Sequence, residues 1–320
     1  MIPHLEHWLR IIEEMKNDNT YKTAWGKGIV ECVHLLEPPL NDPVIIQQSD
    51  IAWNMIKYYW NQTFFFDLKQ GHNPVIVQKV QRMIDKYKRE VNTYPVPWNE
   101  AKSFFDKQPK YMKRIINQIL SNARTNVCPR FLNVSKGERL DIYQIDDDNK
   151  TLIFKKEDIQ VIKEYAFVLS KLLNYKWAQL LERFNTAPKI TNKVQAAAEK
   201  KIRRSSLTKY KNLLLEYYHD KEIRDFYTGE VIDKNDIHID HVIPWSFIYS
   251  DDIWNLVVTK STNNLQKSNR PPTRMDIEKL NQRNMELMEQ LSRSHPSHAK
   301  QIRFALDNKT IDKLFINMKG

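Results

Sequence analysis

Apolar residues recur at intervals of three and four along most of the chain, which is the pattern of amphipathic helices. Near the N-terminus this stripe consists of Leu5, Trp8, Leu9, Ile12 and Met15. The same spacing predicts further helices over 21–36, 49–60, 75–87, 97–107, 109–123, 156–173, 177–184, 276–292, 298–306 and 310–317. The tryptophans and tyrosines on these stripes are expected to pack in the core.

The helical pattern is interrupted by short segments in which apolar and polar residues alternate. The ranges 139–145 and 151–155 flank an Asp- and Asn-rich turn and predict a β-hairpin near 139–155. Two more strands are predicted at 237–240 and 256–259, with a short helix starting at Ser261. We therefore expect a mainly α protein with a small α+β part.

Composition agrees with this fold class and adds one indication of function. The chain has 320 residues, of which 41% are hydrophobic and 28% charged, so it can bury a sizeable core. Only 6 glycines occur, fewer than the turns of a barrel or sandwich need. The net charge of +11 favours encounters with polyanions such as nucleic acids but does not by itself identify a partner.

The two cysteines and the hydropathy pattern bear on the compartment. Cys32 and Cys128 are far apart and form no C-x-x-C pair, so a structural zinc site built on thiolates is not expected. Neither a signal peptide nor a stretch of roughly 18 apolar residues is apparent. We expect a cytoplasmic protein without a membrane partner.

Basic residues are dense between 192 and 218, a range that also carries an apolar helical stripe. The ones closest together are Lys200, Lys201, Arg203 and Arg204. If this range is one helix, its apolar face can pack while these four side chains contact DNA phosphates. The alternative is a solvated charged face with no ligand. Helical periodicity ends near 220–226, which places a domain boundary between a helical recognition or partner region, 1–221, and a second domain, 222–320.

The range 237–268 contains the candidate chemistry. A strand, a second strand and a helix in this order would bring Asp240, His241 and Asn264 towards one point. Asp240 and Asn264 offer hard oxygen ligands for Mg²⁺ or Mn²⁺, and His241 can deprotonate a water molecule. A bound metal would stabilise the leaving 3′ oxygen of a phosphodiester. This division of roles predicts products with 5′-phosphate and 3′-hydroxyl ends.

The order Asp-His-x-x-Pro, Trp-Asn-Leu and Asn-x-x-Lys-Ser over 240–268 resembles the motif of the HNH (His-Me finger, ββα-metal) nucleases. In form it is similar to the HNH domain of CRISPR RNA-guided nucleases and to standalone bacterial HNH endonucleases. The resemblance implies that His241 is the general base, that Asp240 and Asn264 are metal ligands, and that Asn255 orients the loop. It also implies that Lys267 contacts phosphate. His238 is either a group behind the metal ligands or an ordinary strand residue.

The sequence departs from many standalone relatives in one respect. They carry a cysteine pair around a Tyr-x-Gly segment ahead of the motif, which binds a structural zinc, whereas this chain has Asp225 to Gly229 there. We therefore expect no structural zinc. Packing of aromatic side chains is expected to hold the finger instead, namely that of Phe226, Tyr227, Trp245 and Phe247.

These features predict a metal-dependent HNH endonuclease that hydrolyses DNA, expected to be duplex, in restriction or another form of prokaryotic defence. The alternatives are a mobile-element or homing nuclease, an RNA-cleaving HNH nuclease, and a catalytically silent DNA-binding subunit. One finger has one active centre, so a double-strand break would need two nicks, a homodimer or another partner. A regulatory or ATPase protein is a further candidate partner.

Overall fold

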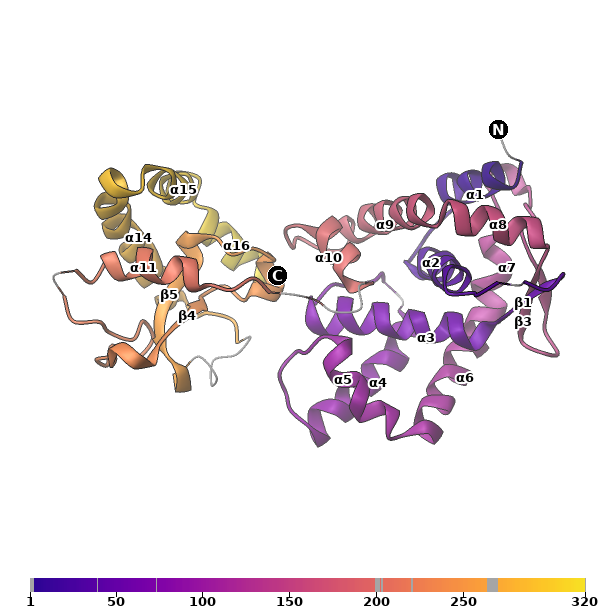
Figure 1. Ribbon diagram of the computed structural model, residues 1–320, viewed down its shortest axis with the longest axis horizontal. Coiled ribbons are helices and arrows are strands. Elements are labelled where there is room, and N and C mark those ends of the chain that lie inside the picture. The colour runs from indigo at the N-terminus through magenta and orange to yellow at the C-terminus, as the bar shows by residue number, and fades with distance from the viewer. Residues whose placement is uncertain are drawn as a thin grey trace. The chain divides into compact units, whose positions relative to one another are not determined.

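The structure is a computed structural model that describes residues 3–38, 40–72, 74–198, 202, 204–219, 221–263 and 270–319. The chain forms two compact units (Figure 1). The first unit consists of Met1–Asn185 and Ile190–Ile202, and the second of Thr186–Lys189 and Arg203–Gly320. Helices dominate and the strands are few and short, which confirms the predicted class of mainly α with a small α+β part.

The first unit is built largely from helices whose apolar stripes face one another. These are α1 (Pro3–Glu14), α2 (Tyr21–His34), α3 (Gln48–Tyr59), α4 (Val75–Glu90), α5 (Trp98–Asp106), α6 (Pro109–Asn126), α7 (Cys128–Phe131), α8 (Lys156–Glu164), α9 (Ala166–Glu182) and α10 (Ile190–Ala197). The π-helix η1 (Trp60–Phe65) continues α3, and η2 (Ser135–Gly137) is a single 3₁₀ turn.

Helix α2 lies at the centre of this unit and packs against α3, α7, α8 and α9. Its two glycines allow this close packing, since a Cβ at Gly26 would lie 2.6 Å from the Phe131 ring and one at Gly28 would lie 2.8 Å from Ile51. The aromatic residues predicted to be core residues are buried around it. Those with almost no exposed surface are Trp8, Trp25, Tyr58, Tyr59, Trp60 and Trp177.

A small antiparallel sheet accompanies these helices. Its strands are β1 (Val44–Gln47), β2 (Gln144–Asp146) and β3 (Thr151–Phe154), in the order β1-β3-β2. The β2–β3 pair is the hairpin predicted near 139–155, although β2 is shorter than the predicted strand. β1 was not predicted, because it has only four residues and runs directly into α3.

Two predicted helical boundaries in this region were wrong. The break predicted between 173 and 177 lies instead at Tyr165, between α8 and α9. The single basic helix predicted over 192–218 is two separate helices, because α10 ends at Ala197 and the next helix starts at Thr208. The apolar stripe of this range is therefore shared between the two units.

The second unit combines a two-stranded sheet with helices. Its elements are α11 (Thr208–Glu216), η3 (Lys234–Asp236), β4 (Ile237–His241), α12 (Trp245–Ile248), η4 (Ile253–Asn255), β5 (Leu256–Lys260), α14 (Arg274–Ser294), α15 (Pro296–Asp307) and α16 (Thr310–Lys319). Of the described residues, 261–263 are also helical. Within the described parts of both units, no helix is long and apolar enough to cross a membrane.

The sheet and helices of the second unit share one hydrophobic core. β4 and β5 pair antiparallel, so Asp240 lies opposite Val257 and His241 opposite Leu256. Helix α11 contacts both strands and α14, and its Leu213 and Leu214 are buried in this core. The contacts within the chain assign Thr186–Lys189 and Arg203–Gly320 to this unit, whereas the sequence predicted a domain boundary between 221 and 222.

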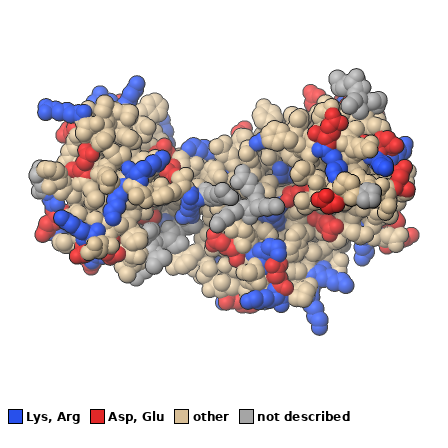
Figure 2. Space-filling model, viewed as in Figure 1, with Lys and Arg blue, Asp and Glu red and all other residues tan. Residues whose placement is uncertain are grey.

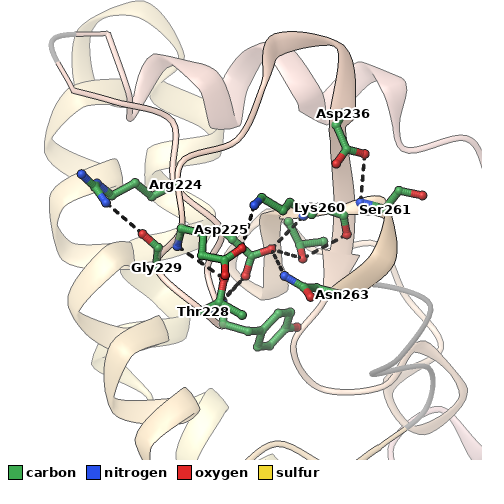
Figure 3. A network of polar contacts seen from close by, with 11 residues as sticks. Arg224, Asp225, Thr228, Gly229, Asp236, Lys260, Ser261 and Asn263 are labelled. Atoms are coloured by element: carbon green, nitrogen blue, oxygen red, sulfur yellow. Dashed lines mark hydrogen bonds and ion pairs between the residues drawn. The ribbon is translucent and has the colours of Figure 1, made fainter.

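The segment that precedes β4 is attached to the sheet by the carboxylate of Asp225 (Figure 3). Its Oδ1 accepts hydrogen bonds from the backbone N–H groups of Tyr227 at 2.8 Å and Thr228 at 2.9 Å. Its Oδ2 accepts from the Thr259 hydroxyl at 2.7 Å, the Lys260 N–H at 2.8 Å and the Asn263 amide at 3.0 Å. One side chain thus joins a turn, the end of β5 and the helical residues that follow it.

These contacts also fix the charge of Asp225. Burial alone would raise the pKa of this carboxyl, but the hydrogen bonds from Asn263, Lys260, Thr228 and Thr259 outweigh it and lower the pKa to about 2. Accepting several N–H and O–H bonds stabilises the ionised form in this way. The polar connection adds to the aromatic packing predicted for the finger, in which Phe226 and Trp245 are buried.

We expect Asp225→Ala to destabilise the protein at neutral pH, and the loss to shrink in acid. Because the folded-state pKa lies below the unfolded value of about 3.9, the stabilisation is present above that value and disappears as the pH falls towards 2. Thermal unfolding midpoints from pH 7 to pH 2.5 measure the difference. Asp307→Ala, which removes an exposed carboxylate at the end of α15, is the control. A difference between wild type and Asp225→Ala that does not change with pH would contradict this account.

Candidate active site

Strand β4 carries the two adjacent residues that the sequence predicted as a metal ligand and a general base. Ile237 and Ile239 give the strand its apolar alternation, and pairing with β5 fixes its register. Asp240 and His241 are both mostly buried, with 9% and 7% of their surface exposed. Successive residues of a strand point to opposite sides, so the two side chains leave the backbone in different directions.

A tyrosine holds the carboxylate of Asp240. The hydroxyl of Tyr227 donates a hydrogen bond to Asp240 Oδ2 at 2.6 Å. Burial, and then the negative charge of Asp240, hold the pKa of Tyr227 well above its ordinary value, so the phenol stays protonated and remains a donor. Tyr227 lies two residues after Asp225, whose carboxylate accepts its backbone N–H. The orientation of Asp240 is therefore coupled to the Asp225 contacts.

The imidazole of His241 is held by a second carboxylate. Its Nε2 lies 3.0 Å from Asp251 Oδ1. The hydrogen bond with His241 lowers the pKa of Asp251 despite the opposing effect of burial, so Asp251 is ionised and can only accept. A neutral His241 in this contact carries its proton on Nε2, which leaves Nδ1 as the basic nitrogen.

The side chain of Asn255 closes the loop between β4 and β5. Its Oδ1 accepts the Ile243 N–H and its amide donates to the Ile243 carbonyl, both at 2.8 Å. The Val242 N–H in turn donates to the Asn255 carbonyl at 2.9 Å. Asn255 is fully buried, so these bonds are shielded from water. It fixes the backbone immediately after His241.

Several of the predicted site residues cannot be placed beside these. Asn264 and Lys267 lie outside the described residues. The preceding residue, Asn263, is the amide that Asp225 binds. His238 is on β4 opposite Thr259, and its side chain is exposed.

Of the four basic residues predicted to contact DNA, only Arg204 can be described. Lys200, Lys201 and Arg203 lie outside the described residues. Arg204 was predicted to lie on a helix, but it lies outside both α10 and α11 and is not helical. Its guanidinium lies over the Trp245 ring, 4.9 Å from the centroid, so it packs on an aromatic residue of the second unit.

Sequence reasoning missed the residues that hold the site together. Tyr227 was predicted only to pack in the finger, and Asp251 only to form a turn. Asp225 was noted only as a residue of the segment in which many relatives carry cysteines. Nothing in the spacing separates Asp251 from Asp252, and the partner of Tyr227 is 13 residues away in sequence. The role of Asp225 could have been predicted, because a carboxylate where many relatives carry a cysteine suggests that hydrogen bonds hold the turn.

The residues present suit a hard divalent cation better than zinc. The Asp240 carboxylate is an oxygen ligand of the kind that Mg²⁺ and Mn²⁺ prefer. Burial raises the pKa of both Cys32 and Cys128 to about 12, so neither supplies a thiolate. Over the described ranges, no group of three or more His, Cys, Asp or Glu side chains could hold an ion, and the second predicted ligand, Asn264, is not among those residues.

Comparison with known proteins identifies this part of the chain. No solved structure matches it. The model of a protein family described as HNH endonuclease matches residues 225–273. That match begins at Asp225, includes Tyr227, Asp240, His241 and Asn255, and ends where α14 begins. Residues 225–273 of the second unit therefore match an HNH endonuclease domain, and this match suggests nuclease activity.

Proposed function

We propose that the protein is a metal-dependent endonuclease that hydrolyses DNA to products with 5′-phosphate and 3′-hydroxyl ends. The observation that carries the proposal is the pair Asp240 and His241 on β4, each held by a different side chain within the HNH match. The net charge of +11 supports a polyanionic substrate. Restriction of foreign DNA, or a related defence role, is the biological setting that we propose.

In this mechanism His241 takes the proton from the attacking water through Nδ1. Asp251 holds the ring in the required tautomer and stabilises the imidazolium that forms, as a buried carboxylate does for other catalytic histidines. Asn255 keeps the backbone at 242–243 in place, so the ring keeps its position relative to Asp251. His241 then holds the proton while the phosphodiester bond breaks.

Asp240 has the separate role of metal ligand. Together with Asn264, it would hold a Mg²⁺ or Mn²⁺ ion, which when bound supplies Lewis-acid stabilisation of the leaving 3′ oxygen. Tyr227 restricts the orientation of the Asp240 carboxylate by donating a hydrogen bond to its Oδ2. Lys267, by its place in the motif, would contact a phosphate of the substrate.

Metal dependence is tested with labelled duplex DNA, single-stranded DNA and RNA, each incubated with Mg²⁺, with Mn²⁺ or with EDTA. We expect cleavage of duplex DNA with either metal and none in EDTA, because charge on the leaving oxygen is then not neutralised. Cleavage of RNA alone would replace the DNA substrate in this proposal. Undiminished cleavage in EDTA would remove the metal from the mechanism.

His241→Ala should reduce the single-turnover cleavage rate by about 10²–10⁴, the usual range for loss of a general base. Affinity for DNA should change little, since the proton transfer contributes to the transition state and not to ground-state binding. His219→Ala, an exposed histidine outside the HNH match, is the control. A His241→Ala enzyme that still cuts within a few-fold of wild type would exclude His241 as the base.

The role of Asp251 predicts a large effect from a small change. In Asp251→Asn the amide can donate to His241 Nε2, which favours the tautomer with the proton on Nδ1. The ring then cannot accept a proton there, and we expect the cleavage rate to fall by about 10²–10⁴. Asp252→Asn changes the neighbouring carboxylate, which bonds Ser250 instead, and should leave the rate nearly unchanged. Equal rates for the two variants would show that Asp251 does not set the tautomer.

A further inference from the structure

The surplus positive charge of the first unit is concentrated in one segment. Residues 75–126, which form α4, α5 and α6, contain eleven Lys and Arg against four Asp and Glu. The remainder of the first unit contains nineteen of each. All of that unit's net charge therefore comes from this segment, chiefly from α4 and α6. Lys and Arg side chains protrude over α4 and α6 on the face drawn in Figure 2.

Helix α6 presents one continuous polar stripe, with Lys110, Lys113 and Arg114 in its first two turns. Its apolar face is buried through Met112, Ile115, Ile119, Leu120 and Ala123. The helix contains no Asp or Glu. Its exposed polar positions follow helical spacing and are occupied by Lys110, Lys113, Arg114, Asn117, Ser121 and Thr125, while the half-buried Arg124 pairs with Asp147. With 18 residues, this stripe is about 27 Å long.

At the N-terminal end of the stripe, cations of α4 and α6 gather around a half-buried tyrosine. The Lys86 Nζ lies 5.4 Å and the Arg114 guanidinium 5.2 Å from the centroid of the Tyr111 ring. Burial raises the pKa of Tyr111, and the nearby charges of Arg114, Arg89 and Arg82 oppose that rise. Glu90 pairs with Lys86, which leaves the local charge strongly positive.

At the C-terminal end the stripe runs into a polar hollow. Its lining includes Asn122 and Asn126 of α6 together with Lys16, Lys22 and Arg130. Burial, and then the positive charge of Arg130, lower the pKa of Lys22, although Asp18 acts in the opposite sense. Two cations that repel each other in a partly buried hollow would be stabilised by an anion placed between them.

The chemistry of the stripe favours a nucleic-acid backbone over other polyanionic partners. A membrane-surface helix needs an exposed apolar face, and the exposed positions of α6 are Lys, Arg, Asn, Ser and Thr. These are the side chains that bind phosphate and sugar oxygens in protein–DNA contacts. Cations at both ends of this stripe, Lys110, Lys113 and Arg114 at one end and Lys22 and Arg130 at the other, also suit a row of phosphates better than a single bound anion.

We propose that the exposed face of α6, with the adjoining cations of α4 and the hollow at Lys22 and Arg130, binds the phosphate backbone of duplex DNA. This inference rests on the proposed function and assigns substrate binding to a face of the first unit. The face is separate in sequence from Lys200, Lys201, Arg203 and Arg204. In this proposal the HNH domain cleaves duplex DNA, and the exposed face of α6 binds the backbone of the same DNA molecule.

The test is binding of a fluorescent duplex of arbitrary sequence, measured by anisotropy over a salt series without divalent metal. The variants are made in a His241→Ala background. One variant replaces Lys110, Lys113 and Arg114 with alanine. The matched control replaces Lys69, Lys155 and Lys171, which are exposed in the remainder of the first unit, and therefore changes the net charge equally.

We expect the α6 variant to bind more weakly and to flatten the slope of log K against log salt by up to about 2.7, since each lost phosphate contact contributes about 0.9. The control should keep the wild-type slope. A charge-preserving variant, with Lys110→Arg, Lys113→Arg and Arg114→Lys, should restore most of the slope. Unchanged binding by the α6 variant, or an equal loss in the control, would overturn the proposal.

Failure of this inference can be told apart from failure of the proposed function. If wild type cleaves duplex DNA while the α6 variant binds with the wild-type slope, only the α6 proposal is wrong. If wild type binds duplex DNA through α6 but does not cleave it under any metal condition, the proposed function is wrong and the binding face stands.

Discussion

The ionised carboxylate of Asp225 is the contact on which the geometry of the HNH domain depends. It binds the turn that contains Tyr227, the end of β5, and Asn263, the residue before the predicted metal ligand Asn264. Tyr227 in turn holds Asp240. One buried anion with five hydrogen bonds thus joins these segments. Such a connection depends on pH, because it relies on the ionised form of Asp225.

The parts of this architecture that could be predicted from sequence are those encoded by local patterns. Helices such as α4, α6 and α14 have long apolar stripes and were predicted almost at their observed bounds. β1 was not predicted because its four residues carry too little periodicity. The break between α10 and α11 was not predicted because an apolar stripe continues across it. Asp240, His241 and Asn255 were predicted as site residues from a motif. Tyr227, Asp251 and Asp225 act through tertiary contacts, which spacing alone does not reveal.

The two units differ in their distribution of charge. The second unit, which contains the HNH domain, has twenty Lys and Arg against sixteen Asp and Glu, so its chemistry is surrounded by nearly balanced charge. The first unit has its whole surplus in residues 75–126, chiefly on α4 and α6. A nuclease needs few residues at the scissile bond and many more to hold a polyanion. A chain that places these tasks on separate units can change its target preference without altering the residues around Asp240 and His241.

The central claim is that His241 activates water for direct hydrolysis of a phosphodiester bond, and the origin of the product oxygen tests it most directly. Single-turnover cleavage of duplex DNA in ¹⁸O-labelled water, followed by mass spectrometry of the fragments, locates the entering atom. The account predicts one labelled oxygen on the 5′-phosphate of one product and an unlabelled 3′-hydroxyl on the other. Products that end in a 3′-phosphate, or a 5′-phosphate without label, would contradict it.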